Sequence, residues 1–178
     1  MMGEIYSIGH SNRTLEFFIS LLQGYEIARL VDARTIPRSR HNPQFNRETL
    51  PEMLRAVGIH YTHMGGLGGL RHPHKDSVNA GWTNSSFRGY ADYMQTEEFN
   101  ENLERLMGMA KKERLAIMCA EAVPWRCHRS LIADALTVRG IAVRHIMSRV
   151  SASRHVVTPW AEVSGRQIIY PSQQPQLF

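Results

Sequence analysis

The stretch Leu115–Gly140, LAIMCAEAVPWRCHRSLIADALTVRG, decides the fold expected for this chain. Its first residues, Leu115–Met118, form an apolar run too short for a helix, so they predict a buried strand. Pro124 is typical of a first helical turn, and the apolar stripe over residues 131–136 predicts a helix that ends near Gly140. The stretch therefore predicts a strand, a loop and a helix, which is the repeating unit of an α/β fold.

The same alternation runs along most of the chain. Apolar runs predict strands at 4–9, 28–31, 59–64 and 141–147, and stripes at helical spacing predict helices at 15–22, 50–57 and 90–110. The stripe over 90–110 predicts either one long helix or two helices broken near Thr96, a good N-cap, and Arg144 and His145 indicate that the last strand is an edge strand or ends there. This pattern predicts an α/β fold with three layers, in which a mostly parallel, Rossmann-like sheet of about five strands lies between helices.

Two segments fall outside this alternation. About twenty residues after Met64 have no clear periodicity, and a connection of that length is more typical of a lid or binding loop than of a linker. Past Ser148 the periodicity is lost and prolines recur. We therefore expect a single α/β domain over residues 1–148, with a long loop after its third strand, and an extended C-terminal tail over residues 149–178.

The composition excludes several classes of protein. With 178 residues, 43% of them hydrophobic, the chain can bury a core, and no run approaches the ~20 apolar residues of a membrane span. No segment has the pattern of a signal peptide and there are two cysteines, so we expect a cytoplasmic protein rather than a disulfide scaffold. The net charge of +5 arises from 18 Arg against 3 Lys, a bias that suits bidentate contacts with phosphate or carboxylate.

Reactive side chains follow the predicted strands at the points where those strands end. Because crossovers between parallel strands are right-handed, the C-terminal ends of the strands share one rim, where open α/β sheets bind ligands. The residues expected at this rim are His10, Asp32, Arg34, Cys119 and Glu121, together with the glycine-rich loop after Met64. We expect them to meet in one cleft although they lie far apart in the sequence.

Arginines mark where an anion would bind. The predicted helix after Pro124 opens with Arg126, Cys127, His128 and Arg129. Free N–H groups and the positive end of the helix dipole favour an anion at this first turn, and Arg126 and Arg129 strengthen that preference. The further substrate-binding candidates are Arg34, Arg38, Arg40 and Tyr90. Arginines interleaved with aromatic rings can bind a phosphate backbone and stack bases, although an ordinary solvated basic face would carry the same charges.

Cys119 is the predicted nucleophile, because a thiol at a strand end that faces an arginine-rich helix start should have a lowered pKa. Asp32 and Glu121 could serve as base and orienting group, with His10 or His128 as the proton carrier. The alternative is structural: free cysteines commonly pack in the core, and the carboxylates would then neutralise neighbouring arginines.

A metal site is the weaker alternative for the same residues. Cys119, Cys127 and His128 have ligand types that suit zinc. On a regular helix, however, Cys127 and His128 are neighbours whose side chains diverge by about 100°. Neither a spaced pair of CxxC motifs nor an HExxH motif occurs, so the cofactor stays open.

Short motifs between residues 8 and 129 carry a resemblance. They are IGHSN (8–12), VDAR (31–34), PRSR (37–40), NPQF (42–45), LGG (67–69), FRGY (87–90), MCAE (118–121) and CHR (127–129). In this order they resemble the domain of unknown function 488 family, and the pairing of MCAE with CHR is the most specific of them. The resemblance implies an α/β fold and this cluster of residues, and it implies no particular reaction.

The sequence thus predicts an enzyme that acts on a phosphate-bearing substrate, nucleic acid or nucleotide, at the rim. A noncatalytic module that binds nucleic acid or protein in the same pocket is the alternative. The chain closes with QPQLF, in which Gln174, Leu177 and Phe178 resemble the short peptide with which bacterial replication and repair proteins bind the sliding clamp. This predicts the clamp as a partner and a link to DNA replication or repair, whereas an apolar end could also fold back onto its own domain.

Overall fold

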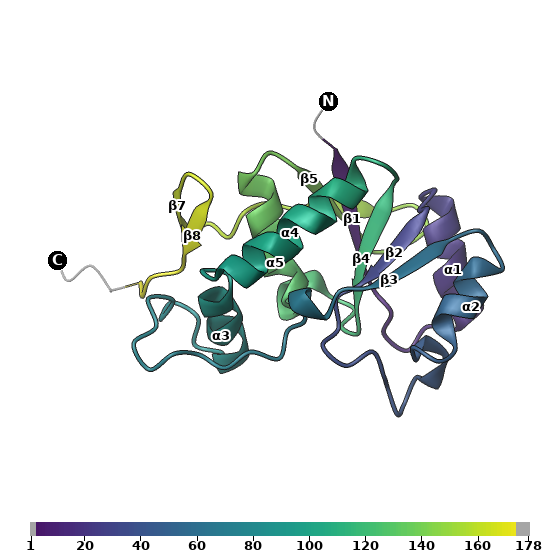
Figure 1. The fold of residues 1–178 in the computed structure, drawn as a ribbon, viewed down its shortest axis with the longest axis horizontal. Coiled ribbons are helices and arrows are strands. Elements are labelled where there is room, and N and C mark those ends of the chain that lie inside the picture. Colours follow the sequence, from purple (N-terminus) through teal and green to yellow (C-terminus); the bar gives the residue numbers. More distant parts are fainter. Residues whose placement is uncertain (1–2, 174–178) are drawn as a thin grey trace.

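The computed structural model describes residues 3–173, shown as a ribbon in Figure 1. Within these residues a six-stranded sheet has the order β3-β2-β4-β1-β5-β6. Its strands are β1 (Glu4–Gly9), β2 (Arg29–Asp32), β3 (His60–His63), β4 (Leu115–Cys119), β5 (Ala142–Ile146) and β6 (Ala152–Arg154). Strands β1 to β5 pair in parallel, and β6 pairs antiparallel with β5. The prediction of a mostly parallel α/β sheet is therefore confirmed.

Strand β4 lies between β2 and β1 and is buried at every position. Its residues alternate between the two cores of the molecule: Leu115 and Ile117 pack on one face of the sheet, and Ala116 and Met118 pack on the other. A strand covered on both faces needs no polar positions, which explains the continuous apolar run. Gly9 is paired with Cys119, so the ends of β1 and β4 are level at the rim.

Helices cover both faces of the sheet and give the three layers that the sequence predicts (Figure 1). α1 (Leu15–Gly24) and α2 (Leu50–Arg55) contribute Phe18, Leu22 and Leu54 to the core on one face. The core on the other face is built from α3 (Ser85–Tyr93), α4 (Glu97–Ala110) and α5 (Arg129–Val138). The predicted break near Thr96 is confirmed, because the Thr96 hydroxyl accepts a hydrogen bond from the N–H of Phe99 and caps α4.

The helix after β4 begins later than the sequence predicts. Pro124–Arg126 forms a short 3₁₀ turn, Cys127 is extended with φ −130° and ψ 147°, and α5 begins only at Arg129. Proline at the first position fits a 3₁₀ turn as well as an α-helix, so the proline signal did not distinguish them. As a correction, Arg126, Cys127 and His128 precede the helix rather than forming its first turn.

The long connection after β3 is confirmed, and it is folded onto the domain. It contains a 3₁₀ turn at Gly65–Leu67 and otherwise runs without regular structure to α3. The carboxylate of Asp92 in α3 accepts hydrogen bonds from the His74 N–H, the Ser77 hydroxyl and the Asn79 amide. These bonds fix the loop to the helix that follows it.

The chain after Ser148 carries more structure than an extended tail. β6 joins the sheet, β7 (Glu162–Ser164) and β8 (Gln167–Ile169) form a hairpin, and Tyr170 is fully buried. β6 covers the outer side of β5, so β5 is not an edge strand and His145 is buried. Each of these added strands has three residues, which is too short for a periodic signal.

The clamp-like motif of Gln174, Leu177 and Phe178 lies outside the described residues. Across residues 3–173, every helix is too short or too polar to span a lipid bilayer.

Candidate functional site

A cleft of about 470 Å³ opens at the C-terminal ends of β2 and β4. The loops after these strands lead to α2 and α5, which lie on opposite faces of the sheet, so the loops diverge and leave a crevice between them. The loop after β3 contributes Gly69 and Leu70. Of the predicted site residues, the cleft brings together Arg34, Arg38, Cys119, Glu121, Arg126, His128 and Cys127, which the sequence offered only as a metal ligand.

Other predicted site residues lie outside the cleft lining. Tyr90 is fully buried, and its hydroxyl donates to the Leu67 carbonyl at 2.8 Å, so it anchors the glycine-rich loop. Arg40 is exposed on the loop after β2. His10, Asp32 and Arg129 are buried behind the cleft wall.

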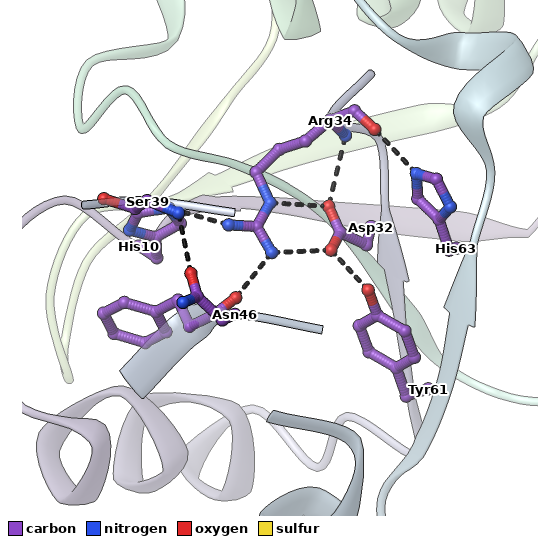
Figure 2. A network of polar contacts seen from close by, with 8 residues as sticks. His10, Asp32, Arg34, Ser39, Asn46, Tyr61 and His63 are labelled. Atoms are coloured by element: carbon purple, nitrogen blue, oxygen red, sulfur yellow. Dashed lines mark hydrogen bonds and ion pairs between the residues drawn. The ribbon is translucent and has the colours of Figure 1, made fainter. Parts of the chain in front are cut away.

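Asp32 and Arg34 form a buried ion pair at the end of β2 (Figure 2). The Arg34 Nε and Nη2 atoms donate to the two carboxylate oxygens of Asp32 at 2.9 and 2.7 Å. Tyr61 donates its hydroxyl to the same carboxylate at 2.5 Å, and burial together with the Asp32 charge raises the pKa of Tyr61 far above its usual range. Asp32 is thus occupied as a charge partner, which is the structural alternative that the sequence left open.

His10 supports this ion pair from the end of β1. Its Nδ1 atom lies 2.8 Å from the Ser11 carbonyl, so Nδ1 carries the proton and Nε2 can accept from Arg34 at 3.4 Å. Its ring stacks on Phe45 with centroids 4.4 Å apart. Burial, opposed by the Ser11 contact, lowers the pKa of His10 to about 4, so the ring is neutral at pH 7.

The two cysteines of the chain both line the cleft and influence each other's ionisation. They are free thiols and are 3% and 6% exposed, so reagents reach them only through the cleft. Burial and the neighbouring sulfur raise the pKa of Cys119 well above its ordinary value. Burial also opposes ionisation of Cys127, but the neighbouring Cys119 thiol, the contact with His128 and the charge of Arg129 hold the pKa of Cys127 well below its ordinary value. The sequence favours Cys119 as nucleophile, whereas the electrostatics of the cleft favour Cys127.

His128 is oriented to activate Cys127. Its Nε2 atom lies 3.1 Å from the carbonyl oxygen of Ala33, and a carbonyl only accepts, so Nε2 carries the proton. In the neutral tautomer inferred from this contact, Nδ1 turns a lone pair toward the Cys127 sulfur 3.6 Å away. A thiol, a base and a third group that orients the base form the usual pattern of an activated nucleophile.

Arg129 points inward from the first residue of α5 and is 1% exposed. Its Nη2 donates to the Glu121 carbonyl at 2.6 Å, its Nη1 donates to the Ser7 hydroxyl at 3.2 Å, and its backbone N–H donates to the Cys127 sulfur at 3.5 Å. The next N–H groups, of Ser130 and Leu131, donate to the carbonyls before the helix. Arg126 is exposed, and it is therefore the guanidinium of this segment that a ligand in the cleft can contact.

Close backbone approaches build this site. A Cβ atom on Gly9 would lie 1.8 Å from the carbonyl oxygen of Glu121, and a Cβ atom on Gly69 would lie 2.6 Å from Nδ1 of His128. Glycine at these positions lets the loop after β4 cross the end of β1 and lets the loop after β3 reach His128.

The position of Cys127 before α5 removes the geometric objection to a shared metal site at Cys127 and His128. Because Cys127 precedes the helix, its sulfur and the His128 ring do lie together, and the helical divergence expected from the sequence does not apply. Within residues 3–173, no group of three or more His, Cys, Asp and Glu side chains is placed to hold a metal ion.

These features define the chain as a three-layer α/β protein that carries a thiol pair in an arginine-lined cleft at the C-terminal rim of its sheet. It belongs to the family described as domain of unknown function DUF488, whose model matches residues 14–136. The match confirms the resemblance seen in the motifs and covers Arg34, both cysteines and His128. Neither a curated protein nor a solved structure matches the chain.

Proposed function

We propose that the protein is an enzyme that acts on a phosphate-bearing substrate, a nucleotide or nucleic acid, with Cys127 as its nucleophile. The observation that carries the proposal is the contact between the Cys127 sulfur and Nδ1 of His128 inside a cleft lined by arginines. A thiol in a cleft with a lowered pKa is a candidate nucleophile, because burial alone would keep a packing cysteine protonated.

The charges of the cleft suit a phosphate group. Arg126 is exposed, and Arg38 is 67% exposed with Glu48 as its partner at 3.0 Å. Both guanidinium groups can turn toward a ligand at little cost, and guanidinium binds phosphate oxygens with two parallel hydrogen bonds. Arg34 is held by Asp32, which neutralises its charge, so its part is to shape the wall of the cleft.

The proposed chemistry is nucleophilic displacement at phosphorus. His128 takes the proton of the Cys127 thiol, and the thiolate sulfur forms a bond to phosphorus while the bond from phosphorus to the leaving oxygen breaks. The leaving oxygen keeps the electron pair and receives the proton from the His128 imidazolium. Water then displaces the sulfur at phosphorus, which regenerates the thiolate. Glu121 is exposed at the cleft, where its carboxylate could accept a proton from that water.

A noncatalytic nucleic-acid-binding module is the second candidate. Trp125, in the 3₁₀ turn between Cys119 and Cys127, is 66% exposed and directly precedes Arg126. An exposed indole beside a guanidinium suits a stacked base and its phosphate without any reaction.

The two candidates differ in what Cys127 does. The full chain, Cys127→Ser and Cys119→Ser should each be incubated with a panel of nucleotides and short single-stranded oligonucleotides. Product formation and intact protein mass are the readouts. An enzyme that uses Cys127 loses turnover and adduct in Cys127→Ser but still binds the oligonucleotide, and Cys119→Ser retains part of the turnover. Equal turnover in Cys127→Ser and the parent would refute the proposed role, and binding without turnover in all three proteins would favour the second candidate.

A further inference from the structure

A line of buried hydrogen bonds leads from Arg129, beside the thiols, through β1 and β5 to Asp134 in the middle of α5. The Arg129 guanidinium contacts the Ser7 hydroxyl at 3.2 Å, and that hydroxyl contacts His145 Nδ1 at 2.5 Å. His145 Nε2 lies 2.9 Å from His155 Nδ1, and His155 Nε2 lies 2.7 Å from a carboxylate oxygen of Asp134. The line joins β1, β5, the segment after β6 and α5, so no single element makes it.

The hydrogen bonds of this line have one direction. The carboxylate of Asp134 accepts from the Thr158 N–H, the Thr158 hydroxyl and the Tyr170 hydroxyl, so it also accepts from His155. With the proton of His155 on Nε2, its Nδ1 must accept from His145 Nε2, and His145 Nδ1 must then accept from Ser7. The oxygen of Ser7 is left with its lone pairs for Arg129.

The line is costly to bury, and its polar atoms from Ser7 to Asp134 are paired, whereas the buried Nε of Arg129 has no partner among the described residues. Ser7, Asp134 and Arg129 are each at most 1% exposed, and His145 is 5% exposed. Burial lowers the pKa of His145 to about 3, so this ring is neutral near pH 7. Buried polar groups that are paired in one direction favour a single geometry at the end of the line.

We propose that Ser7, His145, His155 and Asp134 are positioning residues that hold the guanidinium of Arg129 against the two thiols. Ser7 is the side chain to which the Arg129 guanidinium donates, its other contacts are backbone carbonyls of the loop after β4, and the Arg129 backbone N–H donates to the Cys127 sulfur at 3.5 Å. The positive charge of Arg129 acts to lower the pKa of both thiols. Releasing Ser7 frees Nη1 and lets the guanidinium move away from the sulfurs. This inference rests on the proposed function, because it assigns these residues to the activation of Cys127.

The test measures the pKa of Cys127 directly, in a Cys119→Ser background where Cys127 is the remaining cysteine. Thiolate ultraviolet absorbance is followed against pH in the full chain. Ser7→Ala should raise the pKa of Cys127 by about one unit, the size expected when an opposite charge moves away. Tyr170→Phe is the matched control, because it removes a hydrogen bond to Asp134 but leaves the bond to His155. It should leave the pKa of Cys127 unchanged.

Asp134→Asn distinguishes the positioning of Arg129 from a direct effect of the Asp134 charge on Cys127. Removing a negative charge through space would lower the pKa of Cys127, whereas loss of the positioning line raises it. His145→Leu should also raise the pKa, and His145→Asn, whose amide oxygen can replace Nδ1 as acceptor from Ser7, should restore it in part. These variants keep the inference testable if Ser7→Ala fails to fold.

The outcomes distinguish the two proposals. A pKa of Cys127 that is low in the parent and is unchanged or lowered in Ser7→Ala, Asp134→Asn and His145→Leu overturns the positioning line alone. If Tyr170→Phe raises the pKa of Cys127 as much as Ser7→Ala does, the positioning line is also overturned, because the rise would then reflect a general loosening of the fold. An ordinary pKa of Cys127 in the parent overturns the proposed function together with this inference.

Discussion

The Nδ1 atom of His128 lies 3.6 Å from the Cys127 sulfur, while Nε2 of the same ring lies 3.1 Å from the carbonyl oxygen of Ala33. The ring therefore links the loop before α5 to the residue that follows β2. Activation of the thiol depends on this contact between distant segments, because the Ala33 carbonyl decides which nitrogen faces the sulfur.

His128→Ala should slow alkylation of Cys127 by iodoacetamide. The variant removes the base that takes the thiol proton, so the pKa of Cys127 should rise by at least about one unit, which lowers the thiolate fraction roughly tenfold. The rate is measured at pH 7 in the Cys119→Ser background. His41→Ala, which removes an exposed histidine, is the control and should react at the parental rate. An unchanged rate in His128→Ala would exclude His128 as the activating group.

Asp32→Ala should destabilise the fold by about 3–5 kcal/mol, because it leaves the buried guanidinium of Arg34 without its partner. Denaturant unfolding measures the free energy. Glu48→Ala is the matched control: it removes the carboxylate from an exposed pair with Arg38 and should leave the unfolding midpoint unchanged. Equal midpoints for Asp32→Ala and the parent would show that Asp32 does not stabilise the fold, and the base role expected from the sequence would return.

Some parts of this molecule could be predicted from the sequence because the signal is local. Leu115–Cys119 is covered on both faces, so its apolar run marks the central strand, and strand ends in a parallel sheet meet at one rim. The start of α5 was predicted wrongly, because Pro124 suits a 3₁₀ turn equally well. That error concealed the contact between Cys127 and His128, although the adjacency of the two residues in the sequence was a usable signal.

The positioning line could not be predicted from the sequence. Ser7 and His145 are 138 residues apart, and their contact depends on the pairing of β1 with β5. His155 reaches the line only because β6 folds back along β5, and a strand of three residues leaves no pattern. His145 therefore resembled an edge residue in the sequence, whereas it is buried.

The free energy of unfolding should fall as the pH is lowered from about 6.5 to about 4, in part because of His10. Burial lowers the pKa of His10 from its ordinary value of 6.5 to about 4 in the fold. The unfolded chain therefore binds the proton first, so the stability that neutral His10 contributes is complete above pH 6.5 and is lost as the pH falls through 4. His10→Asn should have a shallower loss than the parent when denaturant midpoints are compared at pH 7 and pH 4.5. If the midpoint falls equally in His10→Asn and in the parent, His10 does not cause the loss of stability at low pH.

We propose the bacterial sliding clamp as a partner of the C-terminal residues, on the resemblance of QPQLF to clamp-binding peptides. Deletion of Leu177 and Phe178 should abolish binding to the purified clamp, because these side chains would fill an apolar pocket while Gln174 fixes the register. Binding is measured with the full chain and the deletion variant, and a Gln173→Ala variant outside the motif is the control. Equal affinity of the full chain and the deletion variant, or no binding by either, would refute the partnership.

Gly69→Ala should slow alkylation of Cys127 with little effect on stability. The added Cβ would lie 2.6 Å from Nδ1 of His128, and that ring cannot simply turn aside, because its Nε2 is bonded to the Ala33 carbonyl and Tyr90 packs beside it. The His128 ring must therefore leave the sulfur or displace the loop.

Gly108→Ala in α4 is the matched control for this change. Its Cβ meets nothing within 4 Å, so it should stabilise the helix by up to about 1 kcal/mol and leave the rate at Cys127 unchanged. Alkylation and thermal unfolding of both variants, in the Cys119→Ser background, separate a local effect on His128 from a general one. If Gly69→Ala reacts at the parental rate, the loop after β3 does not hold His128 in place, and the activating contact must be maintained by the Ala33 carbonyl alone.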